Sequence, residues 1–109
     1  MMSLADVLEK EIERKLTDIV KAHGGLCLKW VCPGWKGVPD RIVILPGARL
    51  CFVETKRPVG GRREKLQEVW ARRLTAFGFP HFWISTFQEL QEFKIFLAEW
   101  APQGEPKDT

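Results

Sequence analysis

Apolar residues recur every three or four positions in three stretches of the chain, a spacing typical of helices that bury one face. The first stretch begins at Ser3, which is placed with Asp6 as a capping box, and stops at His23-Gly24-Gly25. The second runs over residues 62–77, and the third begins at Thr86. The three apolar faces are Ala5, Leu8, Ile12, Leu16 and Ile19; Leu66, Trp70, Leu74 and Phe77; and Leu90, Phe93, Leu97 and Trp100. We therefore expect three amphipathic helices.

Four short runs of strand-forming residues accompany these helices, at residues 26–32, 40–45, 49–56 and 80–85. The second and third runs are separated only by Pro46, Gly47 and Ala48, which predicts a β-hairpin. Neither hairpin strand alternates cleanly between apolar and polar residues, so helices are expected on both sides of the sheet. The predicted fold class is α/β, a mixed sheet of about four strands flanked by helices.

The hairpin turn decides which residues lie opposite each other. If the three-residue loop closes with Leu45 opposite Arg49, then Asp40 lies directly across from Glu54. Their Cβ atoms would then be ~5 Å apart. A slip of one residue would put the two carboxylates on opposite faces, so this inference depends on the turn.

Composition fits one globular domain. The chain has 109 residues, of which 45% are apolar and 28% charged. We place the domain at residues 1–101 and expect 102–109 to be a flexible tail. No apolar run approaches the ~20 residues of a membrane helix, and the N-terminus lacks the apolar segment of a signal peptide. Three cysteines in apolar surroundings suit a reducing compartment, so we expect a cytoplasmic protein with no membrane partner.

The net charge of +3 conceals an uneven distribution. Residues 29–73 contain 11 basic and 4 acidic side chains, a net charge of +7. A concentrated positive zone is expected of a protein that binds a phosphate backbone. The alternative is a solvated basic helix.

Candidate chemistry centres on Asp40, Glu54 and Lys56. Two carboxylates close together on an otherwise apolar face repel each other, so one must take a proton or a cation must lie between them. Oxygen ligands without His or Cys favour Mg²⁺ or Mn²⁺, and the backbone carbonyl of Thr55 is placed to add a ligand. Lys56 shares the face of Glu54, where it could orient or deprotonate a metal-activated water or stabilise charge on a phosphate. This pattern predicts metal-assisted phosphodiester hydrolysis; the alternative is an ordinary Glu–Lys pair on an exposed hairpin.

Longer strings around these residues resemble a known family. Gly37-Val38-Pro39-Asp40-Arg41-Ile42-Val43-Ile44-Leu45, then Phe52-Val53-Glu54-Thr55-Lys56-Arg57-Pro58, then Gln67 and Trp70 are similar to the VRR-NUC domain of the PD-(D/E)xK nuclease superfamily. The likeness spans about residues 9–85. It implies a restriction-endonuclease-like core in which Asp40 and Glu54 bind metal and Lys56 is catalytic.

The resemblance also implies an acidic residue on the first helix. Glu11 and Glu13 lie symmetrically on either flank of the stripe centred on Ile12, so periodicity does not choose between them. Counting back from Gly24, as in the similar archaeal junction resolvases, favours Glu13, with Glu11 as the alternative.

Further residues could complete the site or contact DNA. Gln67 borders the apolar stripe of the second helix and could reach water at the metal site, although a Gln at such a boundary is also ordinary. Trp35, in a loop, could stack on bases or wedge between them. Basic side chains near the site could contact phosphates, although such residues decorate many helices. They are Lys36, Arg57, Arg62 and Arg63, with Lys65, Arg72 and Arg73 beyond them.

The function indicated is that of a Mg²⁺- or Mn²⁺-dependent DNA endonuclease. Free-standing domains of this kind resemble small phage-type proteins that dimerise and cut branched DNA such as four-way (Holliday) junctions, and two sites related by a two-fold axis suit symmetric strands. The alternatives are a flap, end or duplex nuclease within a larger machinery, a catalytically idle DNA-binding module, and a domain that binds no nucleic acid.

Overall fold

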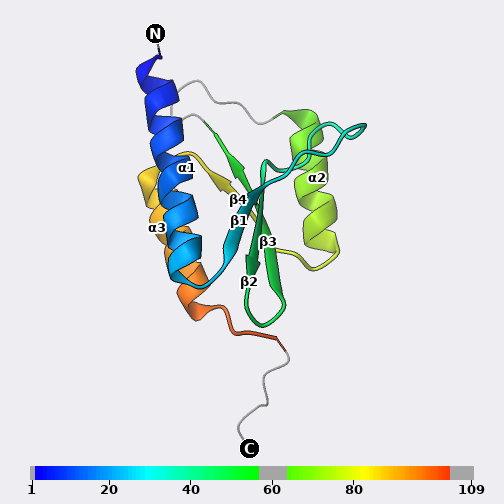
Figure 1. The fold of residues 1–109 in the computed structure, drawn as a ribbon. Coiled ribbons are helices and arrows are strands. Elements are labelled where there is room, and N and C mark those ends of the chain that lie inside the picture. The colour runs from blue at the N-terminus through cyan, green and yellow to red at the C-terminus, as the bar shows by residue number, and fades with distance from the viewer. Residues whose placement is uncertain (1, 57–63, 104–109) are drawn as a thin grey trace, which may run out of the picture.

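The computed structural model describes residues 2–56 and 64–103, which form three helices and one four-stranded sheet (Figure 1). The elements are α1 (Leu4–Ala22), β1 (Leu26–Lys29), β2 (Arg41–Leu45), β3 (Arg49–Thr55), α2 (Lys65–Ala76), β4 (His81–Ile84) and α3 (Phe87–Glu99). The strand order is β1-β2-β3-β4. The pairs β1–β2 and β2–β3 are antiparallel, and β4 is parallel to β3. This confirms the predicted mixed α/β sheet.

Helices α1 and α3 cover one face of the sheet (Figure 1). The predicted capping box opens α1, since the Ser3 side chain accepts from the backbone of Asp6 and the Asp6 side chain accepts from that of Ser3. Thr86 caps α3 by accepting from the backbone N–H of Glu89. The apolar faces of both helices pack on that sheet face and form the core, which contains Ile12, Leu16, Val20, Val43, Leu45, Cys51, Val53, Ile84, Leu90, Phe93 and Leu97.

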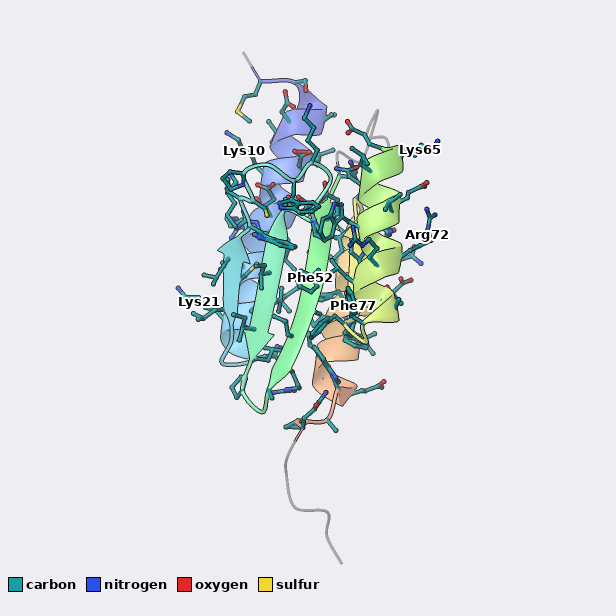
Figure 2. All side chains as sticks on the ribbon, turned by 90° about the vertical axis from the view of Figure 1, so that its right-hand side faces the viewer. Lys10, Lys21, Phe52, Lys65, Arg72 and Phe77 are labelled. Atoms are coloured by element: carbon teal, nitrogen blue, oxygen red, sulfur yellow. The ribbon has the colours of Figure 1, made fainter. Side chains whose placement is uncertain are left out.

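Helix α2 lies on the opposite face and covers only part of it (Figure 2). Its predicted apolar stripe was partly wrong: Leu74 is buried, but Leu66 and Phe77 are 50% and 72% exposed. The reason is that α2 packs on the β4 side of the sheet, so the ends of the stripe extend past it. Over β1 and β2 the same face stays open, and Leu26, Leu28 and Ile44 are exposed there.

The predicted hairpin register is confirmed. Leu45 lies opposite Arg49 and Arg41 lies opposite Val53. Continuing this register by one position brings Asp40, just before β2, alongside Glu54 near the end of β3. The turn therefore delivers both carboxylates to the same end of the sheet.

The run expected at residues 26–32 forms a shorter strand than predicted, because β1 ends at Lys29. Lys29 lies opposite Arg41, the first residue of β2. One further backbone bond, from Trp30 N–H to the Asp40 carbonyl, follows. Pro39, the next residue of the partner, has no N–H to continue the pairing. The remaining residues up to Pro39 therefore form a loop above the strand end.

At the other end of the sheet, the chain after α3 packs against the hairpin turn. The backbone N–H of Gln103 donates to the Gly47 carbonyl at 2.7 Å, and Pro102 contacts Gly47. The rest of the predicted tail, residues 104–109, lies outside the described residues. Within the described ranges, no helix is both long enough and apolar enough to cross a membrane.

Candidate active site

The predicted site residues meet where β2 begins and β3 ends, between α1 on one face and α2 on the other. Asp40 precedes β2, while Glu54 and Thr55 close β3 and are both 6% exposed. Each hairpin strand therefore contributes acidic groups to one buried corner of the sheet.

Thr55 holds the carboxylate of Asp40 from two directions. Its backbone N–H donates to Oδ1 at 3.0 Å, and its hydroxyl donates to Oδ2 at 2.6 Å. The same hydroxyl lies 3.2 Å from Oε1 of Glu13, which reaches the site from α1. A hydroxyl has one proton, so it can donate to only one of these two acidic oxygens at a time. Asp40 and Glu13 thus compete for one donor, so one of the two acidic oxygens lacks this hydrogen bond at any moment.

Glu54 is held by a second set of contacts, on the α2 side. The backbone N–H of Asp40 donates to its Oε2 at 2.9 Å, and the side-chain amide of Gln67 donates to its Oε1 at 2.6 Å. The amide oxygen of Gln67 in turn accepts from Nζ of Lys56, which lies 3.7 Å from Oε1 of Glu54. Gln67 therefore connects the predicted metal ligand and the predicted catalytic lysine.

The two carboxylates are electrostatically strained. Burial, and after it the nearby charge of Asp40, raises the pKa of Glu54 to about 7. Burial likewise raises the pKa of Asp40, although the hydrogen bonds from Thr55 work against it. A bound cation would relieve both penalties, because an opposite charge favours the ionised carboxylate.

These residues fit a hard divalent cation that retains several waters. Among residues 2–56 and 64–103, no three His, Cys, Asp or Glu side chains are arranged as a metal site. Mg²⁺, however, is commonly held by one or two carboxylates with water completing its shell. Every oxygen of Asp40 and Glu54 that accepts a hydrogen bond still has a second lone pair. The candidate ligands are therefore the two carboxylates and the Thr55 carbonyl.

The structure places the two candidate helix carboxylates differently. Glu13 faces the sheet and contacts Thr55, whereas Glu11 forms ion pairs with Arg14 and Lys15 on the outside of α1. Helical periodicity alone does not show which of the two glutamates faces the site, because this depends on how α1 lies across the sheet. Glu13 is the residue that the fold brings to the corner.

Sequence reasoning missed two groups at this corner. One is the Thr55 side chain, for which only the backbone carbonyl was considered. The other is Arg41, whose Nη2 lies 3.9 Å from Oε2 of Glu13 and whose buried Nε has no hydrogen-bond partner among the described residues. The available signal was a charged residue on a strand face otherwise made of Val43 and Leu45.

The predicted DNA contacts are only partly within the described residues. Lys36 and Trp35 lie exposed in the loop before Asp40, and Arg73 lies over the ring of Trp70 on α2. Lys65 and Arg72 lie on the exposed side of α2 (Figure 2). Arg57, Arg62 and Arg63 fall in the undescribed segment 57–63.

Comparisons with known proteins agree with the resemblance seen in the sequence. A solved structure described as "VRR_NUC domain" matches 86% of this chain and 98% of its own length, with a TM-score of 0.75 and 24% identity. The chain therefore has the fold of a VRR_NUC domain, as predicted. A curated phage protein, "Putative nuclease p44" of Acyrthosiphon pisum secondary endosymbiont phage 1, is 46% identical over 52 residues. These residues are 48% of this chain and 56% of that relative. No model of a known protein family matches this chain.

Proposed function

We propose that this chain is a DNA nuclease of the VRR-NUC family that depends on Mg²⁺ or Mn²⁺. The observation that carries the proposal is the convergence of Asp40, Glu54 and Lys56 at one corner of a sheet with the VRR_NUC fold. The phage relative described as a nuclease supports the same activity and an origin in a phage or prophage, acting inside the host cell.

Asp40, Glu54 and the Thr55 carbonyl would hold the metal ion. When bound, the cation would act as a Lewis acid toward water and the scissile phosphate. The raised pKa values of Asp40 and Glu54 mean that these carboxylates are costly to ionise without a cation. Metal binding and proton release should therefore occur together.

Lys56 and Gln67 act on the reacting groups from the α2 side. The Lys56 side chain is 16% exposed, and its ammonium donates to the Gln67 amide oxygen, which leaves protons of the ammonium to meet a phosphate oxygen. Such an oriented cation stabilises charge that develops on a phosphate in the transition state. Glu13, on the other side, would position water and orient Asp40 through Thr55.

Basic residues close in the sequence to Asp40 and Lys56 would guide the DNA backbone. The net charge of +7 on residues 29–73 favours association with phosphates in a salt-dependent manner. Lys36, Arg57, Arg62 and Arg63 are the proposed phosphate contacts.

We further propose that the substrate is branched DNA and that the active form is a homodimer. An apolar patch is available for self-association, because Leu26, Leu28 and Ile44 are exposed on the half of the sheet that α2 leaves open (Figure 2). A two-fold pair of sites suits symmetric strands of a four-way junction.

Cleavage of a labelled DNA panel tests this function. The substrates are a linear duplex, a single strand, a flap and a four-way junction, each with Mg²⁺, with Mn²⁺ and with EDTA. Lys56→Ala is the inactive variant, and Lys21→Ala, in the last turn of α1, is its matched control. We expect junction-selective cutting that EDTA and Lys56→Ala abolish and Lys21→Ala leaves intact.

The other outcomes separate the remaining functions. Preferred cutting of flaps, ends or duplex would replace the junction as the substrate. Salt-sensitive binding without cleavage of any DNA would indicate a catalytically idle binding module instead of an enzyme.

A further inference from the structure

The loop between β1 and β2 is attached to α2 at two points. At Gly37, where φ is +90°, a Cβ atom would come within 2.7 Å of the backbone of Leu66, so the loop lies directly on the first turn of the helix. The indole N–H of Trp70 donates to the Lys36 carbonyl at 3.0 Å. These contacts fix the residues just before Gly37 to α2.

Trp35 directly precedes the loop residues that contact α2, and its side chain is 58% exposed. Its ring meets that of Trp70 edge to face, with centroids 5.9 Å apart and planes at 89°. Trp70 also contacts Trp30, and the Arg73 guanidinium lies 4.9 Å from its ring. The exposed indole is therefore held in place on an aromatic base and has cations nearby, including the exposed Lys36.

Helix α2 links this indole to the candidate active site. Gln67 lies one turn before Trp70 on α2 and binds Glu54 and Lys56. The same part of α2 thus contacts both the candidate site and the loop that carries Trp35. The indole is therefore attached to the helix that also orients Glu54 and Lys56.

We propose that Trp35 stacks on an unpaired base of the DNA strand being cut, next to the scissile phosphate. This inference rests on the proposed nuclease function, and it specifies one feature of the DNA substrate, an unpaired base beside the cleaved bond. In a continuous duplex both faces of each base are already stacked, and inserting a ring between them costs unstacking energy. An indole therefore stacks more favourably where a base is free, at a branch, flap or gap. Trp35 thereby selects DNA that is interrupted near the cleaved bond over continuous duplex.

Fluorescence tests the stacking without relying on cleavage. Two DNAs of one sequence are used, a continuous duplex and a duplex with a single-stranded gap, the latter with 2-aminopurine at an unpaired position beside its edge. Binding to wild type, Trp35→Ala and Trp35→Phe is measured in EDTA at one fixed salt concentration. Phe77→Ala is the matched control, because Phe77 is also an exposed aromatic residue and lies at the far end of α2.

We expect wild type to quench 2-aminopurine and Trp35→Ala to lose the quenching. Trp35→Ala should bind gapped DNA roughly 10- to 100-fold more weakly, the loss expected for one base–aromatic stack, with duplex affinity changed less than about 3-fold. Trp35→Phe should retain most of the preference for the gap, and Phe77→Ala all of it.

Several results would overturn the proposal. Equal losses on gapped and continuous DNA would make Trp35 a general contact, and unchanged binding would remove it from the interface. A change of oligomeric state in Trp35→Ala, seen by sedimentation, would make the indole a contact between copies of the chain. Loss of quenching in Trp35→Ala alongside a wild type that cuts nothing would uphold the stacking and refute the nuclease.

Discussion

At the scale of single residues, the corner of the sheet is built from competing hydrogen bonds. Thr55 donates to Asp40 and lies within reach of Glu13, while Gln67 shares its two amide atoms between Glu54 and Lys56. Positioning by neighbours of this kind can be as important to a metal site as the ligands themselves. Glu13 provides the cleanest test, because α1 carries a second glutamate two positions away that points outward.

We predict that Glu13→Gln lowers cleavage and that Glu11→Gln does not. Losing the Glu13 charge removes a group that faces the ligand Asp40 through Thr55, and changes of this kind typically cost 10- to 100-fold in activity. Glu11 forms surface ion pairs with Arg14 and Lys15, so its variant should stay within about 2-fold of wild type. Steady-state cleavage rates on the preferred DNA give the fold-change of each variant relative to wild type. Similar losses in the two variants would contradict the placement of α1.

A second residue-scale prediction concerns stability against pH without metal. Folding raises the pKa of Glu54 from 4.5 to about 7, so the folded protein binds this proton more tightly than the unfolded chain. The free energy of unfolding therefore falls as pH rises from 4.5 towards 7 and levels off above, by no more than about 3 kcal/mol. The raised pKa of Asp40 acts in the same direction.

Glu54→Gln removes the charge that must be buried, so its stability should fall less over this range. Urea unfolding in EDTA between pH 4.5 and 8.5 measures the difference, with Glu92→Gln on the exposed side of α3 as control. Parallel pH curves for wild type and Glu54→Gln would show that the buried charge of Glu54 has no effect on folding.

At the scale of elements, local signals predicted what lies within one segment, and packing decided the rest. The capping box of α1, the cap of α3 and the hairpin register could be read from the sequence, because each is set by residues a few positions apart. Helical periodicity did not separate Glu13 from Glu11, and only the family resemblance favoured Glu13. The early end of β1 and the exposure of Leu66 and Phe77 could not be read from the sequence. These features depend on the packing of the elements: how α1 lies across the sheet, where β2 begins, and how little of the sheet α2 covers.

The attachment of the β1–β2 loop to α2 gives an element-scale prediction. Gly34 and Gly37 both have positive φ, +86° and +90°, but a Cβ at Gly34 meets nothing within 4 Å whereas one at Gly37 meets the Leu66 backbone. Gly34→Ala should therefore lower the free energy of unfolding only by the cost of a positive φ in a residue with a Cβ, about 1 kcal/mol. Gly37→Ala must also move the loop off the helix, and we expect a loss of at least about 2 kcal/mol.

Urea unfolding separates the two variants, and tryptophan emission reports on the loop. Only Gly37→Ala should shift the emission of the folded protein, because Trp35 and Trp30 pack on Trp70 through this loop. Equal stability losses in Gly34→Ala and Gly37→Ala would mean that the loop is not held by α2.

At the scale of the whole molecule, the uneven cover of the sheet is the feature that bears on assembly. One face is sealed by α1 and α3, while the other carries a single helix and exposes Leu26, Leu28 and Ile44 next to one another across β1 and β2. Contiguous apolar residues on an otherwise charged surface commonly mark an interface. The candidate site lies where β2 begins, and β2 also carries part of this patch, so a two-fold pairing here would set the spacing of two sites.

Leu28→Lys should convert the proposed dimer to a monomer, because it places a charge within this patch. Ile95→Lys, a change of the same kind at a comparably exposed position on α3, should leave the dimer intact. Sedimentation equilibrium gives the masses, and junction cleavage gives the consequence. A monomer with a complete site should still nick one strand but lose the paired cuts on opposite strands, since these require two sites in one particle. Paired cuts by a monomeric Leu28→Lys would show that one copy of the chain resolves the junction alone.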